Sequence, residues 1–162
     1  MKKITNPFVK LDNHYCFCCS NRNPIGLKLE FWLDEEEEMV FTNWEPSRSY
    51  QGYPNVLHGG IQSTLMDEVA SWAVYILLQT AGFTTKIDIK IKKPVHIDKG
   101  ALKVTAKVIS TEKKISNILT KLYDSEGTLC SEGIIQYYIY PQQTAIEKLD
   151  YPGFDAFFPN PG

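Results

Sequence analysis

The sequence predicts an α+β domain in which an antiparallel sheet of about six strands surrounds one long helix. Three observations predict this fold. An apolar run with helical periodicity covers residues 59–80, strand-like segments lie on both sides of it, and short turn signals join the later strands. A chain of 162 residues is long enough for one domain with a sizeable core. With no internal repeat, we expect a single domain over residues 1–162.

The helix has a clear apolar stripe that should face the core. Its members recur at helical spacing: Ile61, Leu65, Val69, Trp72 and Ile76. One helix cannot cover both faces of such a sheet, so one face of the sheet must curl around the helix and bury this stripe.

The strands are predicted by alternation and by the turns that separate them. Six segments fit this pattern: 27–33, 39–44, 84–92, 102–110, 115–123 and 128–140. Short turns such as Asp98-Lys99-Gly100 indicate antiparallel hairpins. Residues 1–26 are predicted to be irregular and residues 141–162 to form an extended tail. The exposed sheet edge favours self-association.

Composition excludes several classes of function. The chain is 43% hydrophobic and 22% charged with a net charge of −2, which is ordinary for a globular protein and not the basic balance of a nucleic-acid binder. No apolar signal sequence follows Met1, and the apolar stretch 69–78 is too short to span a membrane. We therefore expect a cytoplasmic protein without nucleic-acid or membrane partners. Three of the four cysteines lie within residues 16–19, where they cannot link distant parts of the chain, so we expect reduced thiols.

The helix entrance carries the chemistry. Gly59 and Gly60 leave backbone N–H groups accessible at the positive end of the helix dipole. Asp67 lies about 200° around the helix from Leu65, so it points away from the core stripe. An oxyanion donor followed by a base or nucleophile is the minimum equipment for acyl transfer. Glu68 lies nearer the core stripe and ranks second to Asp67 as the reactive carboxylate.

Three segments resemble a known family. Cys16-Phe17-Cys18-Cys19-Ser20-Asn21-Arg22-Asn23-Pro24-Ile25-Gly26-Leu27 resembles the Cys-Phe-x-Cys-Gly…Asn-Pro-x-Gly-Leu opening of one of its branches. Residues 50–60 resemble the loop that enters the central helix, and Asp67 falls at the acidic position. Over residues 14–140 the chain therefore resembles the hotdog-fold thioesterase superfamily, in particular PaaI-like acyl-CoA thioesterases.

The resemblance implies hydrolysis of acyl-CoA thioesters by a homodimer or a homotetramer (a dimer of dimers), without a cofactor. Gly59 and Gly60 both stand at the helix entrance, and the Gly59 N–H would polarise the thioester carbonyl. Asp67 of the neighbouring subunit would act as general base or nucleophile. His58 would shape the loop or polarise the carbonyl. Thr84 or Thr85 stands at the position where relatives often have a hydroxyl that helps to orient the water, and we favour Thr85 for this role.

Four residues are candidates for binding the substrate. Gln51 and Asn55 stand before the histidine, where some relatives position the nucleophilic water. Lys90 and Lys92 could meet the phosphates of coenzyme A, although a solvated strand face explains them equally well. Asn55 and Ser20 both replace a glycine of the family pattern.

Two other functions stay open, and a metal site is not predicted. The chain could be a non-catalytic acyl-CoA-binding module or an enoyl-CoA hydratase or dehydratase of the same fold. A metal site would recruit Cys16 and Cys19, with Cys18 and His14 as further candidates. Zinc sites commonly use two well-spaced ligand pairs, and the sequence has one Cys-x-x-Cys and no second pair.

Overall fold

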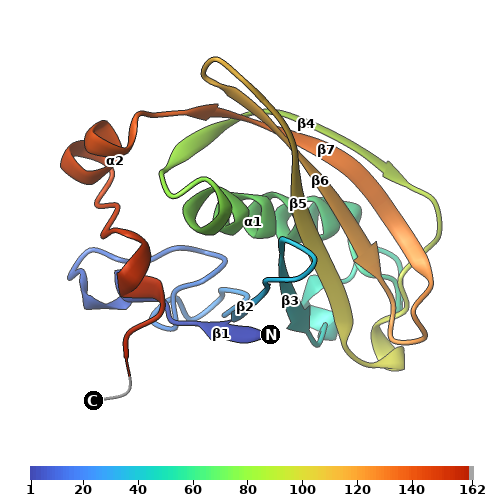
Figure 1. The fold of residues 1–162 in the computed structure, drawn as a ribbon. Helices are drawn as coiled ribbons and strands as arrows, with labels where there is room; N and C mark the ends of the chain where they lie inside the picture. The colour runs from blue at the N-terminus through green and yellow to red at the C-terminus, as the bar shows by residue number, and fades with distance from the viewer. Residues whose placement is uncertain (161–162) are drawn as a thin grey trace.

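The computed structural model describes residues 1–160 and has the predicted hotdog fold. A seven-stranded antiparallel sheet curves around the long helix α1 (Gly59–Leu77), as Figure 1 shows. The strand order across the sheet is β1-β2-β3-β5-β6-β7-β4. The other elements are β1 (Lys2–Ile4), β2 (Phe31–Asp34), β3 (Met39–Trp44), β4 (Gly82–Ile91), β5 (Leu102–Glu112), β6 (Ile115–Tyr123), β7 (Leu129–Ile139) and the short helix α2 (Gln142–Lys148).

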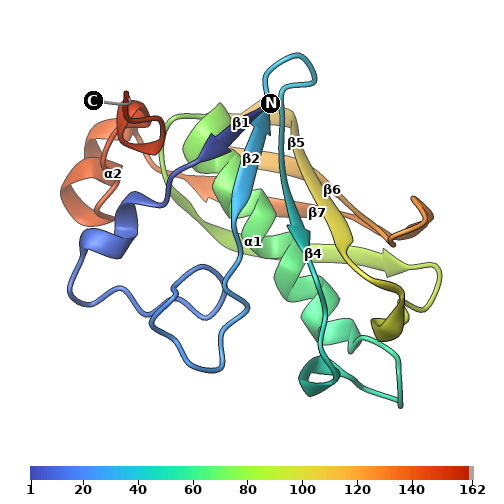
Figure 2. The same cartoon turned by 90° about the horizontal axis from the view of Figure 1, so that it is seen from below.

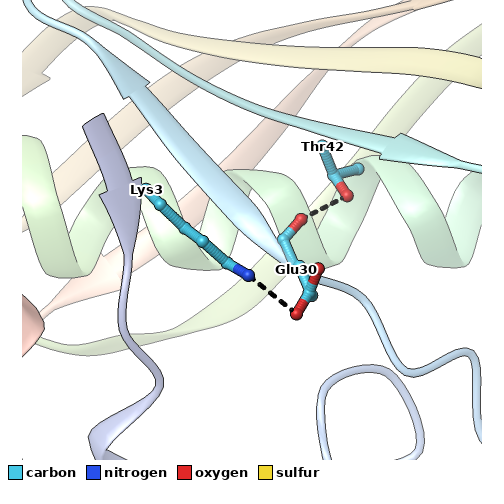
Figure 3. Close-up of polar contacts among 3 residues, drawn as sticks. All are labelled: Lys3, Glu30 and Thr42. Carbon is cyan, nitrogen blue, oxygen red and sulfur yellow. Dashed lines mark hydrogen bonds and ion pairs between the residues drawn. The ribbon is translucent and has the colours of Figure 1, made fainter. Parts of the chain in front are cut away.

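The additional strand, β1, lies in the segment predicted to be irregular and pairs antiparallel with β2. Lys3 Nζ lies 3.0 Å from Glu30 Oε1, and Thr42 Oγ1 donates a hydrogen bond to the Glu30 carbonyl at 2.6 Å (Figure 3). A strand of three residues is too short to show a period-2 pattern. The predicted strand 27–33 is also shorter, because Leu27 and Leu29 bond to the loop that precedes them.

The helix α1 begins at the predicted residue and ends three residues early. Gln79 has a φ of +52°, a left-handed conformation that takes the chain out of the helix. The core stripe is confirmed: Leu65, Val69, Trp72 and Ile76 are buried and Ile61 is half-buried. No helix within residues 1–160 is both long enough and apolar enough to cross a membrane.

The C-terminal tail is not extended throughout as predicted, since it contains α2 and a short 3-10 helix, Phe154–Phe157. It packs beside the N-terminal segment at one end of α1, which both views show (Figures 1 and 2). Phe157 is fully buried and contacts the rings of Trp72 and Tyr75. The tail therefore completes the core around α1.

Residues 14–27, the cysteine loop, form an ordered turn against α1. Asn23 organises it, because its Oδ1 accepts from the Ile25 N–H at 3.1 Å and its Nδ2 donates to the Tyr15 carbonyl at 3.3 Å. A Cβ on Gly26 would lie 2.6 Å from the Phe17 carbonyl oxygen, so only glycine fits there. The Asn-Pro-x-Gly-Leu pattern is thus the sequence of a turn that presents the cysteines.

Candidate active site

The entrance of α1 offers one unused backbone donor. His58 caps the helix: its Nδ1 accepts from the Gly60 N–H at 2.9 Å, and its carbonyl accepts from Ile61 and Gln62. Within residues 1–160, the Gly59 N–H donates no hydrogen bond. Of the two predicted glycines, Gly59 therefore keeps a free N–H at the positive end of the helix, whereas that of Gly60 is occupied.

Space for a ligand lies on both sides of this entrance. Two cavities of about 370 Å³ each flank it; His58 lines both, Gly59 lines one and Gly60 the other. A Cβ on Gly59 would lie 3.0 Å from Cδ1 of Ile91, at the end of β4. Glycine at this position thus keeps the approach to the N–H open.

The Asp67 carboxylate is held by one of its oxygens. Its Oδ1 accepts from Thr84 Oγ1 at 2.7 Å and from the Tyr137 hydroxyl at 2.8 Å, and this hydroxyl also lies 2.8 Å from the Asp67 backbone carbonyl oxygen. Burial raises the pKa of Tyr137, and the Asp67 charge adds to this, so the phenol stays a donor. In the described part of the chain, no hydrogen bond reaches Oδ2 of Asp67. This oxygen is left to accept a proton or to attack a carbon.

The hydroxyl beside Asp67 comes from Thr84 and not from the favoured Thr85. Thr84 pairs with Tyr137 across β4 and β7, and the register shifts between Thr84 and Lys86. Thr85 is the extra residue of this bulge, and its Oγ1 bonds to Gln136 instead. Thr85 therefore forms no hydrogen bond with Asp67 of its own chain, because a bulge moves one side chain out of the strand alternation.

Glu68 faces different partners from Asp67. Its Oε1 accepts from Trp72 Nε1 at 3.1 Å and lies 3.8 Å from the sulfur of Cys16. Burial raises the pKa of Glu68 to about 7. Glu68 is therefore directed into the cysteine loop, away from Thr84 and Tyr137.

The predicted substrate residues Gln51 and Asn55 are tied into their own loop. Gln51 Oε1 accepts from the Asn55 N–H at 3.2 Å, and Asn55 exchanges two hydrogen bonds of 3.1 Å with Asp98. Asn55 has a φ of +63°, a left-handed conformation that asparagine tolerates better than most residues. Within this chain, both side chains stabilise the loop that enters α1.

The two predicted lysines lie at the exposed end of β4 and its exit. Lys92 forms an ion pair of 2.8 Å with Glu132 across the strands. Lys90 is exposed and stands opposite Glu132 in the register. Neither lysine lines the cavities at the helix entrance.

The free donor and the free carboxylate oxygen are far apart within one chain. Gly59 and Asp67 are eight positions apart on the same helix, which corresponds to about 12 Å along its axis. A carbonyl oxygen held by the Gly59 N–H would leave its carbon beyond the reach of Asp67 in the same chain. The structure thus presents two separate candidate half-sites, which we name the Gly59 half-site and the Asp67 half-site.

Comparison with known proteins agrees with this fold. The model of the family described as "Thioesterase superfamily" matches residues 54–131, which include both half-site residues. A protein of Saccharolobus solfataricus named "Putative esterase SSO1253" is 27% identical over 95 residues, which are 58% of this chain and 62% of that protein. The chain thus spans less than two thirds of the length of this curated relative.

Solved structures share the fold at low sequence identity. A thioesterase from Haemophilus influenzae has a TM-score of 0.67 and 20% identity, covering 76% of this chain and 86% of that one. A Bacillus halodurans protein solved with CoA has a TM-score of 0.62 and 19% identity, covering 71% and 76%. A further thioesterase superfamily protein matches with a TM-score of 0.64 over 57% of its length. The chain is thus similar to the thioesterase superfamily over residues 54–131 and shares its fold with these solved structures.

Proposed function

We propose that two copies of this chain assemble so that the Gly59 half-site of one faces the Asp67 half-site of the other, and that the pair hydrolyses acyl-CoA thioesters. The observation that carries this proposal is the free Gly59 N–H together with a carboxylate that has one fixed and one free oxygen. The CoA bound to the Bacillus halodurans relative supports the choice of thioester.

The proposed reaction uses each half-site for one task. The thioester carbonyl oxygen accepts a hydrogen bond from the Gly59 N–H, which stabilises the negative charge that develops there. Oδ2 of Asp67 takes a proton from water while the water oxygen bonds to the carbonyl carbon. The carbon–sulfur bond then breaks, and the thiolate leaves without a strong acid catalyst. Direct attack by Oδ2, followed by hydrolysis of the anhydride, uses the same geometry.

Thr84 and Tyr137 act as positioning residues in this scheme. Both donate to Oδ1, so they fix the orientation of the carboxylate and leave Oδ2 free. His58 holds the helix entrance through its cap on Gly60. Lys90, exposed on β4, is the predicted residue best available for a CoA phosphate, because Lys92 is paired.

The test measures free thiol released from a panel of acyl-CoA substrates. Asp67→Asn keeps the shape of the side chain and removes the base, so we expect kcat/KM to fall by about 10²–10⁴. The matched control is Asp88→Asn, an exposed carboxylate on β4, which should hydrolyse at the wild-type rate.

The other outcomes separate the alternatives. If Asp67→Asn is as fast as wild type, the proposed role of Asp67 is wrong. Binding of acyl-CoA without thiol release would make the chain a binding module. Rapid hydration of an enoyl-CoA without thiol release would make it a hydratase.

A further inference from the structure

A second group of reactive side chains lies where the cysteine loop meets α1. The sulfurs of Cys16 and Cys18 and a carboxylate oxygen of Glu68 all lie within 4.8 Å of one another. The two cysteines come from the loop and Glu68 comes from the helix, 50 residues or more further along the chain. The proposed hydrolysis uses none of these groups.

The cluster is held in place by its own hydrogen bonds. The backbone N–H groups of Cys18 and Cys19 donate to the Cys16 sulfur at 3.3 and 3.4 Å. Trp72 Nε1 donates to the Glu68 carboxylate at 3.1 Å. Donors of this kind orient ligands and compensate their negative charge in metal sites.

A buried imidazole nitrogen nearby lacks a partner. His14 Nε2 is the one buried side-chain nitrogen or oxygen within residues 1–160 that has no hydrogen-bond partner. His14 lines the same cavity of about 290 Å³ as Cys16 and Glu68. Buried polar atoms are normally paired, so this nitrogen indicates a missing partner in that cavity.

We propose that Cys16, Cys18, Glu68 and His14 form a structural zinc site that fastens the cysteine loop to α1. Two sulfurs, one carboxylate oxygen and one imidazole nitrogen are ligand types that Zn²⁺ binds in tetrahedral sites. Calcium and magnesium require oxygen ligands, so this donor set excludes them. With Zn–S bonds of about 2.3 Å, ligand atoms of a tetrahedron lie about 3.8 Å apart, so the Cys16, Cys18 and Glu68 atoms have to approach one another by up to about 1 Å. His14 lies outside this cluster of three and has to move toward it through the cavity that it shares with Cys16 and Glu68.

This proposal replaces the expectation that the cysteines bind no metal. That expectation named Cys16 and Cys19, with Cys18 and His14 as further candidates, and rejected a metal site because the sequence has no second ligand pair. The fold supplies Glu68 from a distant helix and selects Cys18 as the second sulfur. Four protein ligands leave no open position, so the ion would stabilise the fold and take no part in hydrolysis.

The experiment uses the full chain and zinc alone. Protein stripped of metal and kept reduced is titrated with Zn²⁺ against a chromogenic chelator, and we expect one equivalent to bind per chain. Cys16→Ser and Glu68→Gln should each weaken zinc binding by more than about tenfold. Cys130→Ser is the matched control, since this buried thiol lies on β7 outside the cluster, and its affinity should equal that of wild type.

A second measurement needs no variant. Wild-type protein loaded with Co²⁺ should show the near-ultraviolet charge-transfer band of thiolate ligands. Wild-type protein that binds no zinc, a cobalt spectrum without this band, or full zinc affinity in Cys16→Ser would each overturn the proposal. Equal loss in Cys130→Ser would overturn it as well.

Discussion

The asymmetry of the Asp67 carboxylate is the residue-scale feature on which the proposed chemistry depends. Two donors, Thr84 and Tyr137, reach the same oxygen, Oδ1. A carboxylate fixed in this way loses rotational freedom before the substrate arrives, and its free oxygen has a defined direction. The two donors should therefore influence rate without contacting the substrate.

Tyr137→Phe tests this positioning role. The variant removes one donor to Oδ1 and keeps the buried ring, so we expect kcat to fall by roughly tenfold with little change in KM, and the free energy of unfolding to fall by about 1 kcal/mol. Steady-state kinetics and denaturant unfolding measure the two effects. Tyr138→Phe is the control, since Tyr138 stacks on Phe83 and does not contact Asp67. A loss of stability with unchanged kcat would show a purely structural tyrosine.

Gly59→Pro removes the proposed oxyanion donor and is compatible with the helix. Proline is favoured at the first position of a helix, where its missing N–H has no helical partner. His58 already has φ −58° and ψ 133°, the extended conformation that a residue before proline requires. We expect kcat to fall by about 10²–10³. Gly59→Ala adds a Cβ near Cδ1 of Ile91 as proline does, but it keeps the N–H, so Gly59→Pro should be clearly slower than Gly59→Ala. Equal rates for the two variants would contradict the role of the donor.

The sequence reveals only some of this site. Helical phase separates Asp67 from the core stripe, and paired glycines mark the helix entrance. The sequence left Thr84 and Thr85 as alternatives and did not indicate Tyr137. Their positions depend on the register between β4 and β7, which are far apart in the chain, and on the bulge at Thr85. His58 could be either a cap or a catalytic group until the hydrogen bond to Gly60 showed the cap.

At the scale of elements, long periodic segments were predicted well and short ones were not. The helix α1 and strands β3 and β6 match their predicted ranges closely. The helix buries one face, and β6 alternates regularly between buried and half-buried residues. The strand β1 and the helix α2 were missed. Both are short, and packing against neighbouring elements holds them in place more than their own pattern does.

The tail should contribute strongly to stability. Phe157 is fully buried against Trp72 and Tyr75, so Phe157→Ala should lower the free energy of unfolding by about 3–5 kcal/mol. Phe158→Ala, which truncates a half-buried ring next to it, should cost clearly less. Chemical denaturation of both variants decides this. Equal losses would mean that the tail packs loosely on α1.

At the scale of the whole molecule, the helix itself separates the two half-sites. The distance of about 12 Å between Gly59 and Asp67 follows from helix geometry, so no change of loop conformation within one chain brings them together. The exposed edge strand β4, with its exposed Phe83, Ile87 and Ile91, offers apolar surface for a second copy. An assembled pair of chains would contain two complete sites.

The most direct test of this account is subunit complementation. Gly59→Pro and Asp67→Asn chains are each close to inactive, but a mixed dimer would contain one site with both groups intact. Co-expression in equal amounts should therefore restore about a quarter of wild-type acyl-CoA hydrolysis, because half of the dimers are mixed and each has one working site. Activity no higher than that of the separate variants, in verified mixed dimers, would contradict a site shared between two chains.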